Sequence, residues 1–374
     1  MMKIKFSIVF ISISCFLFAQ EFNTFLQSEK TWDLSDSNSL IMEIDNVNFF
    51  KNNELMGDFK QGYTLPGYLL KSRLTYYPGD KTRISAGLHL VQMFGDVDYY
   101  EVRPTIGIQH ALTPKLHLVM GELHGNLNHG LIDPLYDYDR YFVDNLEQGL
   151  QLLVFSDFLT ADLWLDWENF ILWGDPSQEE GTLGFSGKVH VIKDNPQWAV
   201  DLPLQAIICH RGGQINNTLM QNNSQTNLAP GLQITYFTGT FIKSLSFKGH
   251  YVYFRDLDNV DYFREGYGIY PGFTIQTKLF EFQTAYWHAN KYYSPRGDPL
   301  YFSVSSYRNT IENNRDMLIN KLGCRKKYKN GISAGLFADT YYDINNGTLE
   351  YNYSIYLRFD AAYFLKKVRM MERD

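Results

Sequence analysis

The chain has 374 residues, a formal net charge of −7, 45% hydrophobic residues and 16% aromatic residues, including 27 Tyr and 27 Phe. The length admits one large domain or two of average size, and the negative charge argues against a nucleic-acid partner. Beyond its N-terminal leader the sequence has no run of about 18 or more apolar residues, which excludes a helical membrane protein. Many Tyr and Phe without such runs favour a membrane-spanning β-barrel, in which only every second strand residue faces lipid. A water-soluble all-β protein is the alternative.

The first element is a secretory signal peptide over residues 1–19. Lys3 and Lys5 precede an apolar run, and Ala19 follows it as the small residue beside which cleavage is expected. The apolar run is too short for a spanning helix, so the pattern predicts an exported chain. Residues 20–38 are polar and lack a clear period. They are expected to form a short periplasmic segment.

About sixteen candidate strands follow, with fourteen or eighteen as alternatives. Short, turn-rich connections alternate with long ones, as expected for tight periplasmic turns and larger outer loops. An even count places both ends of the chain on the periplasmic side, as closure of an up-and-down barrel requires. The candidate strands cover residues 39–50, 68–77, 83–94, 99–112, 116–125, 145–155, 159–171, 181–193, 197–211, 228–237, 244–255, 266–279, 280–291, 315–328, 332–343 and 348–364.

The last strand, within the stretch YNYSIYLRFDAAYF from Tyr351 to Phe364, shows the pattern most clearly. A strand about ten residues long with aromatic residues at both ends has the dimensions of one that crosses an outer membrane. Its partner should be the strand near Ser39–Phe50, because a closed barrel leaves no edge exposed to lipid. Residues 365–374 are expected to form a periplasmic tail. Alternation assigns two faces: Tyr351, Tyr353, Ile355, Leu357, Phe359, Ala361 and Tyr363 against Asn352, Ser354, Tyr356, Arg358 and Asp360.

The signal peptide, the alternation, the unequal loops and the aromatic strand near the C-terminus resemble the porin-type superfamily of bacterial outer-membrane β-barrels. The resemblance is one of pattern over most of the chain, without a motif for any subfamily. It implies an all-β, antiparallel, up-and-down transmembrane barrel over residues 39–364 in a Gram-negative outer membrane. It also implies passive diffusion of small polar solutes, with selectivity set by lining charges and an infolded loop. Expected partners are outer-membrane lipid, small polar solutes and further copies of the chain.

If the apolar strand faces meet lipid, the opposite faces line a lumen, because a charge facing lipid at mid-depth costs about 2–4 kcal/mol. Such a lining either surrounds a wet constriction, which favours a porin, or pairs across the lumen and closes it. A closed barrel would favour a structural role, anchoring a secretion, motility or surface complex through a periplasmic or surface protein partner. The predicted pore-lining residues are Lys71, Arg73, Arg103, Asp162, Asp166, Glu168, Lys188, His190, Lys248, His250, Lys278, Glu281, Arg358 and Asp360.

The long outer connection at residues 126–145 interleaves acidic with aromatic residues. A loop of this length is expected to fold into the lumen as a constriction, and a sugar- or calcium-binding loop is the alternative. The aspartate spacing does not match an EF-hand, and paired Cys/His spacings are absent, so no metal or cofactor is predicted. The candidate constriction or ligand residues are Asp133, Tyr136, Asp137, Tyr138, Asp139 and Arg140.

A hydrolase with a site at the barrel rim is the third interpretation. His124 and His129 lie near Asp133 and Asp137 in the sequence, and a rim site would need an imidazole beside a carboxylate or serine. No stretch matches a nucleophile motif such as G-x-S-x-G. The sequence therefore predicts a protein that is not an enzyme.

Overall fold

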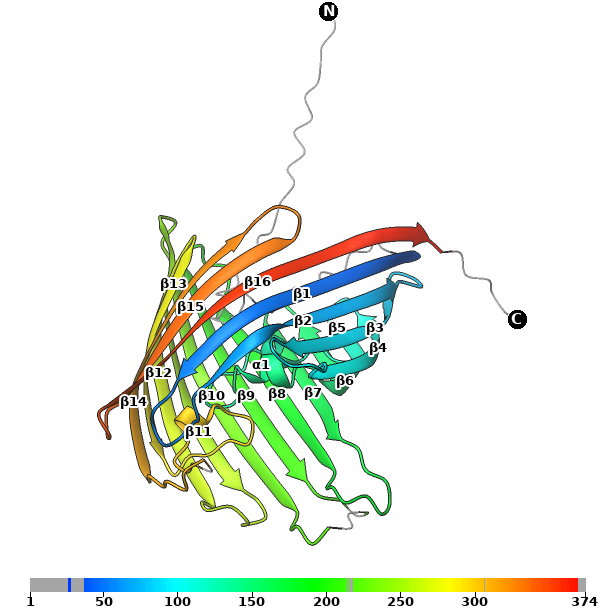
Figure 1. Cartoon of the computed structure of the whole chain (residues 1–374). Coiled ribbons are helices and arrows are strands. Elements are labelled where there is room, and N and C mark those ends of the chain that lie inside the picture. Colours follow the sequence, from blue (N-terminus) through cyan, green and yellow to red (C-terminus); the bar gives the residue numbers. More distant parts are fainter. Residues whose placement is uncertain (1–25, 28–36, 214, 216–217, 306, 369–374) are drawn as a thin grey trace, which may run out of the picture.

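A computed structural model shows a closed antiparallel barrel in which each strand pairs with its neighbours in sequence (Figure 1). The structure describes residues 26–27, 37–213, 215, 218–305 and 307–368. The predicted signal peptide and most of the predicted periplasmic segment lie outside the described residues. The strands are β1 (Ser39–Glu54), β2 (Tyr63–Tyr76), β3 (Thr82–Met93), β4 (Glu101–Thr113), β5 (Leu116–Glu122), β6 (Gln148–Phe155), β7 (Leu159–Asn169), β8 (Glu180–Ile192), β9 (Trp198–Arg211), β10 (Asn223–Phe237), β11 (Ile242–Asp256), β12 (Glu265–Thr277), β13 (Phe280–Asn290), β14 (Asn314–Lys327), β15 (Ile332–Asp343) and β16 (Thr348–Lys367).

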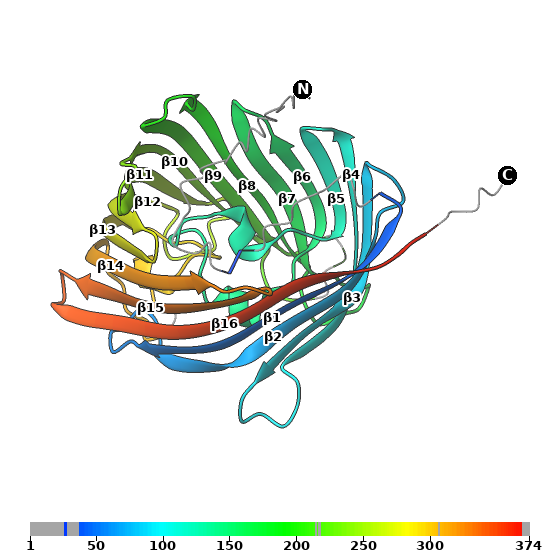
Figure 2. The same cartoon turned by 90° about the horizontal axis from the view of Figure 1, so that it is seen from above.

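The barrel closes where β1 pairs with β16, from Ser39 opposite Lys367 to Glu54 opposite Tyr351 (Figure 2). This confirms the predicted fold class and the predicted partnership of the first and last strands. β16 continues past its predicted end at Phe364, because β1 begins early enough to pair with it. The Lys367 ammonium also donates to the hydroxyl of Ser39 at 2.9 Å. The sheet therefore has no free edge at the seam.

The two faces of the strands differ as the alternation predicts. In β16, Ile355 and Leu357 are exposed, whereas Ser354 and Tyr356 are buried. Other strands follow the same pattern, with large apolar side chains on the outer surface at alternate positions. A barrel that spans a membrane needs an apolar outer surface, because that surface contacts the hydrocarbon of the lipid. None of the helices in the described part of the chain is long and apolar enough to cross a membrane.

Two long connections fold back inside the ring of strands. Loop L3, residues 123–147, joins β5 to β6, and loop L7, residues 291–313, joins β13 to β14. Figure 2 shows L3 within the barrel when it is viewed along its axis. L3 contains a short 3-10 helix, η3 (Asn126–His129), and a single α-helical turn, α1 (Arg140–Val143); L7 contains η4 (Pro299–Tyr301). The predicted infolding of the long outer loop is thus present.

The interior is less polar than the sequence predicts. Trp287 and Met317 point inward from the wall and pack against Leu135 of L3 and Leu300 of L7. A second cluster joins β1, β2, β3 and β16 to Phe142 of L3, and a third joins β5, β6, β7 and β9. Inward positions can be apolar here because they face the inserted loops rather than water. The core of this protein is therefore a plug inside the barrel.

Candidate functional site: the inserted loop L3

Short turns fix the path of L3. η3 ends at Gly130, whose φ of 66° places it in the left-handed region that favours glycine. The amide of Leu135 donates to the carbonyl of Ile132 at 2.8 Å and closes a turn. After α1, the amide of Asp144 donates to the carbonyl of Arg140 at 2.8 Å. These turns leave the acidic and aromatic side chains of L3 free to reach the surrounding wall.

The carboxylate of Asp139 attaches L3 to β1 and β2. It forms a buried ion pair with Lys51 and accepts hydrogen bonds from the Asn53 amide at 3.1 Å and the Tyr63 hydroxyl at 2.5 Å. Burial alone would raise the pKa of Asp139, but the ammonium groups of Lys51 and Lys60 hold that pKa below its usual range. Asp139 is therefore ionised in the folded protein.

A second aspartate, Asp137, shares the ammonium of Lys60 with two other carboxylates. The Lys60 Nζ lies 3.0 Å from Asp137, 3.1 Å from Asp139 and 3.2 Å from Asp298 of L7. Burial raises the pKa of Asp137 to about 7, against the opposing effect of Lys60. Neighbouring carboxyl groups whose pKa values are pushed apart in this way are the usual form of an acid–base site.

On the opposite side of the lumen, the imidazole of His129 joins L3 to β7. Its Nδ1 lies 2.7 Å from Asp162 and its Nε2 lies 2.6 Å from Glu147, while the ring stacks on Trp164 with centroids 3.5 Å apart. Burial alone would lower the pKa of His129, but the two carboxylates raise it to about 10. Both ring nitrogens are engaged in these ion pairs. His129 therefore acts as a cationic clamp and not as a general base.

Two further contacts complete the attachment of L3. The ammonium of Lys321 on β14 lies 2.6 Å from Asp133, which also accepts hydrogen bonds from the hydroxyls of Tyr270 and Tyr301 at 3.2 Å. The side chain of Gln205 on β9 accepts from the amide of Ile132 at 2.9 Å. L3 is thus fastened to β1, β2, β7, β9, β12 and β14, which lie all around the barrel.

Loop L7 packs directly against L3. Tyr292 donates to the carbonyl of Pro134 at 2.9 Å, and the amide of Asp137 donates to the carbonyl of Arg296 at 2.7 Å. Arg296 pairs with Glu168 on the wall, and a Cβ on the next residue, a glycine, would lie 2.1 Å from the Pro134 carbonyl. L7 and L3 therefore form one packed unit.

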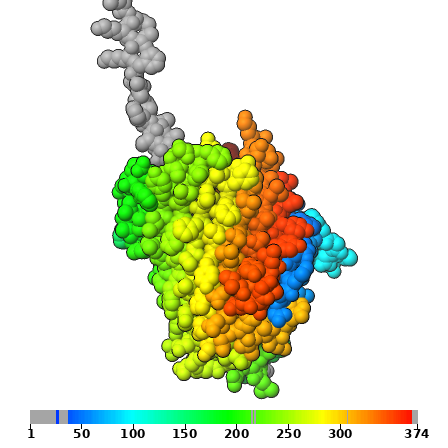
Figure 3. Space-filling view, turned by 90° about the vertical axis from the view of Figure 1, so that its left-hand side faces the viewer, coloured from blue at the N-terminus to red at the C-terminus, as the bar shows by residue number. Residues whose placement is uncertain are grey.

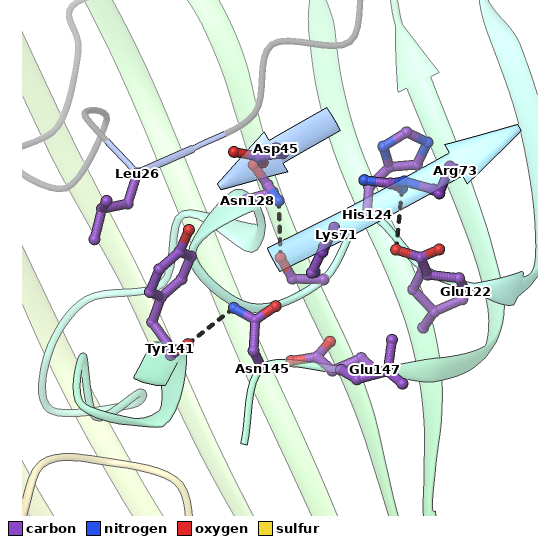
Figure 4. A pocket seen from close by; sticks show the side chains of 13 residues that line it. Leu26, Asp45, Lys71, Arg73, Glu122, His124, Asn128, Tyr141, Asn145 and Glu147 are labelled. Atoms are coloured by element: carbon purple, nitrogen blue, oxygen red, sulfur yellow. Dashed lines mark hydrogen bonds and ion pairs between the residues drawn. The ribbon is translucent and has the colours of Figure 1, made fainter. Parts of the chain in front are cut away.

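A small cavity lies between the roots of L3 and the inner wall of β1 and β2 (Figure 4). Its volume of about 30 Å³ has room for roughly one water molecule. Arg73 donates to Glu122 at 3.0 Å at its edge. Lys71 also lines it, and this ammonium makes no hydrogen bond or ion pair with any described residue. In this conformation the cavity is too small for a solute. The residues around it are Leu26, Asp45, Lys71, Arg73, Glu122, Leu123, His124, Gly125, Asn128, Tyr141, Asn145, Leu146 and Glu147.

Most of the predicted pore-lining residues do point inward and are buried or half-buried, and several form ion pairs. Arg358 lies 2.9 Å from Asp45, and His190 lies 2.7 Å from Asp201. Their role in lining a conducting channel remains a prediction. The prediction for Lys278 is wrong, because β12 ends at Thr277 and leaves Lys278 exposed in the following turn.

The side chain of Asp360 is 57% exposed, so this predicted lining residue reaches the solvated mouth of the barrel. It lies past the last pair between β15 and β16, which joins Ile332 to Phe359. Arg358, the preceding inward residue of β16, lies 3.2 Å from it. Asp360 therefore sits near the end of the barrel at which β16 ends and not at the level of L3.

The six predicted loop residues all belong to L3. Among its attachment residues on other elements, Asp162 was predicted to face the lumen, but the lysine and tyrosine partners of the L3 aspartates were not. Lys51 and Tyr63 lie just outside the predicted strands, because β1 runs later and β2 starts earlier than their apolar patterns indicate. Lys60 lies on L1, residues 55–62, where no periodic signal marks it. Lys321 could have been found, since it continues the inward alternation of Met317 and Ile319.

The His129 clamp gives the stability of the protein a predictable pH dependence. Its folded pKa of about 10 lies above the unfolded value of about 6.5, so its contribution is fully present below about pH 6.5. That contribution is lost as the pH rises through 10. We expect the difference in Tm between the wild type and His129→Gln to be largest near pH 6 and to shrink by pH 10.5. A difference that grows with pH would contradict the clamp.

The outward apolar faces, the closed up-and-down sheet of sixteen described strands and the inserted loops define a β-barrel of the bacterial outer-membrane class. The sequence model of the Lipid A 3'-O-deacylase-type family matches residues 32–368, and the chain belongs to this family. The family is named for an enzyme activity, which overturns the prediction that the protein is not an enzyme.

Solved structures agree with this fold. The loop L8 deletion mutant of OmpT, an outer membrane protein of Vibrio cholerae, is 11% identical with a TM-score of 0.51, over 86% of this chain and 100% of that chain. OccK2 (OpdF) of Pseudomonas aeruginosa, solved in complex with glucuronate, is 10% identical with a TM-score of 0.51, over 87% of this chain and 99% of that chain. At such identities the likeness establishes the fold alone. No curated protein matches the sequence.

Proposed function

We propose that the protein is an outer-membrane hydrolase that releases an ester-linked acyl chain from lipid A. The match to the Lipid A 3'-O-deacylase-type family supports this activity. The structural observation that carries it is the attachment of L3 to opposite walls by the buried ion pairs of Asp139, His129 and Asp133. A lumen occupied in this way fits a rigid site better than an open diffusion path, because reacting groups must be held in fixed positions.

Asp137 and Asp139, the paired carboxyl groups beside Lys60, provide the groups that act on the ester. At neutral pH Asp137 is partly ionised and accepts a proton from water as the water oxygen attacks the ester carbonyl carbon. The Lys60 ammonium stabilises the resulting oxyanion. Collapse breaks the bond to the sugar oxygen, which takes the proton back from Asp137. The products are a fatty acid and a free sugar hydroxyl.

We expect Asp137→Asn to lower the rate of deacylation by roughly 100- to 10,000-fold, the usual contribution of a general base. The measurement is the fatty acid released from vesicles that contain lipid A. In the wild type the rate should rise with pH through about 7, because Asp137 must be ionised to accept the proton. Asp58→Asn is the control, since Asp58 is a half-exposed acid of L1. An unchanged rate in Asp137→Asn would remove Asp137 from the mechanism.

Passive diffusion of small polar solutes is the second candidate function. The observation in its favour is the charged inner wall below L3, where Arg358 pairs with Asp45 and His190 pairs with Asp201. This function requires L3 to leave its position. Conductance steps from the wild type in planar bilayers would support it, together with absence of deacylation. A silent bilayer from a folded protein would exclude it.

A further inference from the structure

Two adjacent strands of the barrel wall, β5 and β6, are short. β5 has 7 residues and β6 has 8, whereas a strand needs about 9–11 residues to cross the hydrocarbon core. On the extracellular side their pairing ends with Glu122 opposite Gln148. In Figure 1, β5 and β6 stop well before the green strands that follow them. The extracellular half of the wall is therefore incomplete between β4 and β7.

Both flanking strands continue beyond their short partners. β4 pairs with β5 from Gly107 onward, so Glu101–Ile106 extends past the end of β5. β7 pairs with β6 up to Asp166, so Trp167–Asn169 extends past the start of β6. Open edges are rare in membrane barrels, because unpaired backbone groups are costly in hydrocarbon. On the side that Figure 3 shows, neighbouring strands are paired along most of their length.

The side chains around this gap suit a lipid that has acyl chains and anionic groups. Arg103 on β4 pairs with Glu101, and Arg140 on α1 pairs with Asp144. Guanidinium groups bind phosphate by paired, charge-assisted hydrogen bonds. The outward side chains that flank the gap are large, apolar and exposed: Val102, Ile106, Met120, Leu150 and Trp167.

The helical turn α1 leads from the gap to the carboxyl pair of the proposed active site. Asp144 lies at its C-terminal end, near the start of β6, and has a side chain that is 45% exposed. Asp139 lies at its N-terminal end. A helix of four residues is about 6 Å long. A lipid that contacts Asp144 is therefore about one helical turn away from Asp139.

We propose that the gap between β4 and β7 is a lateral portal through which a phosphorylated glycolipid of the outer leaflet reaches L3. The acyl chains lie along the apolar flank, and the phosphate groups meet Arg103 and Arg140. This proposal rests on the proposed function for the identity of the lipid. It explains how a closed lumen receives a substrate that cannot leave the membrane.

Site-specific crosslinking tests the portal without relying on activity. Asp144 is replaced by the photoreactive amino acid p-benzoylphenylalanine, and the protein is placed in vesicles of phosphatidylethanolamine with or without lipid A. Arg308 of L7 is the matched control position, because its side chain is 55% exposed on the same side of the membrane. Heat-modifiable migration in gels confirms that both variants are folded.

We expect lipid A adducts at position 144 to exceed those at position 308 by at least about five-fold. We also expect adducts at position 144 to be more abundant with lipid A than with phosphatidylethanolamine alone. Equal yields at the two positions would overturn the portal, and equal yields with the two lipids would overturn its selectivity for a phosphorylated glycolipid. Strong lipid A adducts from a protein without deacylase activity would leave the portal standing and remove the proposed function.

Discussion

Deleting most of L3 should turn a barrel that conducts no ionic current into one that conducts. Joining residue 126 to residue 145 by a short Gly/Ser linker removes the clamp at His129 and the attachments at Asp133 and Asp139. L7 then loses the partner that it packs against. Barrels of 16–18 strands without such a plug leave an aqueous channel. We therefore expect discrete conductance steps in planar bilayers from the excised protein and none from the wild type.

The control for this experiment is a similar shortening of the largely exposed loop at residues 257–264, which joins β11 to β12. That variant should conduct no current, because no residue of this loop takes part in the ion pairs that hold L3. Steps from the wild type would show that L3 does not close the lumen. A folded, silent barrel after excision of L3 would show that L7 closes it alone.

Replacing His129 by alanine should destabilise the protein strongly. The change leaves Asp162 and Glu147 facing each other in a buried site without the imidazolium between them. Removing one partner from a buried ion pair typically costs about 3–5 kcal/mol, and the lost stacking on Trp164 adds to it. We expect the free energy of unfolding in urea to fall by about that amount, with intermittent conductance as L3 loosens.

His190→Ala is the matched control for that experiment. His190 also pairs with an aspartate, Asp201, but its side chain is 19% exposed and it does not hold L3. Its loss should cost about 1 kcal/mol or less, as for solvent-screened pairs. Similar losses in the two variants would contradict a special role for the buried clamp.

The strand pattern could be predicted from the sequence because lipid imposes a strict alternation on the wall. The predicted pairing of β16 with β1 follows from closure alone. The predicted strands reach residue 125 and begin at residue 145, whereas β5 ends at Glu122 and β6 begins at Gln148. The predicted strands are longer because Leu123 and Leu146 continue the apolar pattern. The structure buries both inside the barrel. A pattern of apolar residues does not reveal whether a leucine faces lipid or packs against an inserted loop. The sequence therefore does not predict how short β5 and β6 are.

The site was predicted only in part for a related reason. The acidic and aromatic character of residues 126–145 indicates infolding, which the structure shows. The partners of these acids, Lys51, Lys60 and Lys321, lie far away in sequence and meet L3 only through barrel closure. The sequence does not predict an enzyme, because it contains no local nucleophile motif such as G-x-S-x-G. Paired carboxyl groups in a loop carry no such motif.

Mass spectrometry of lipid A tests most directly whether the closed barrel deacylates this lipid. Wild-type protein in vesicles of lipid A should shorten the lipid by the mass of one ester-linked acyl chain and release the corresponding fatty acid. The same preparation should give no conductance in planar bilayers. Unchanged lipid A after treatment with folded protein would contradict the account.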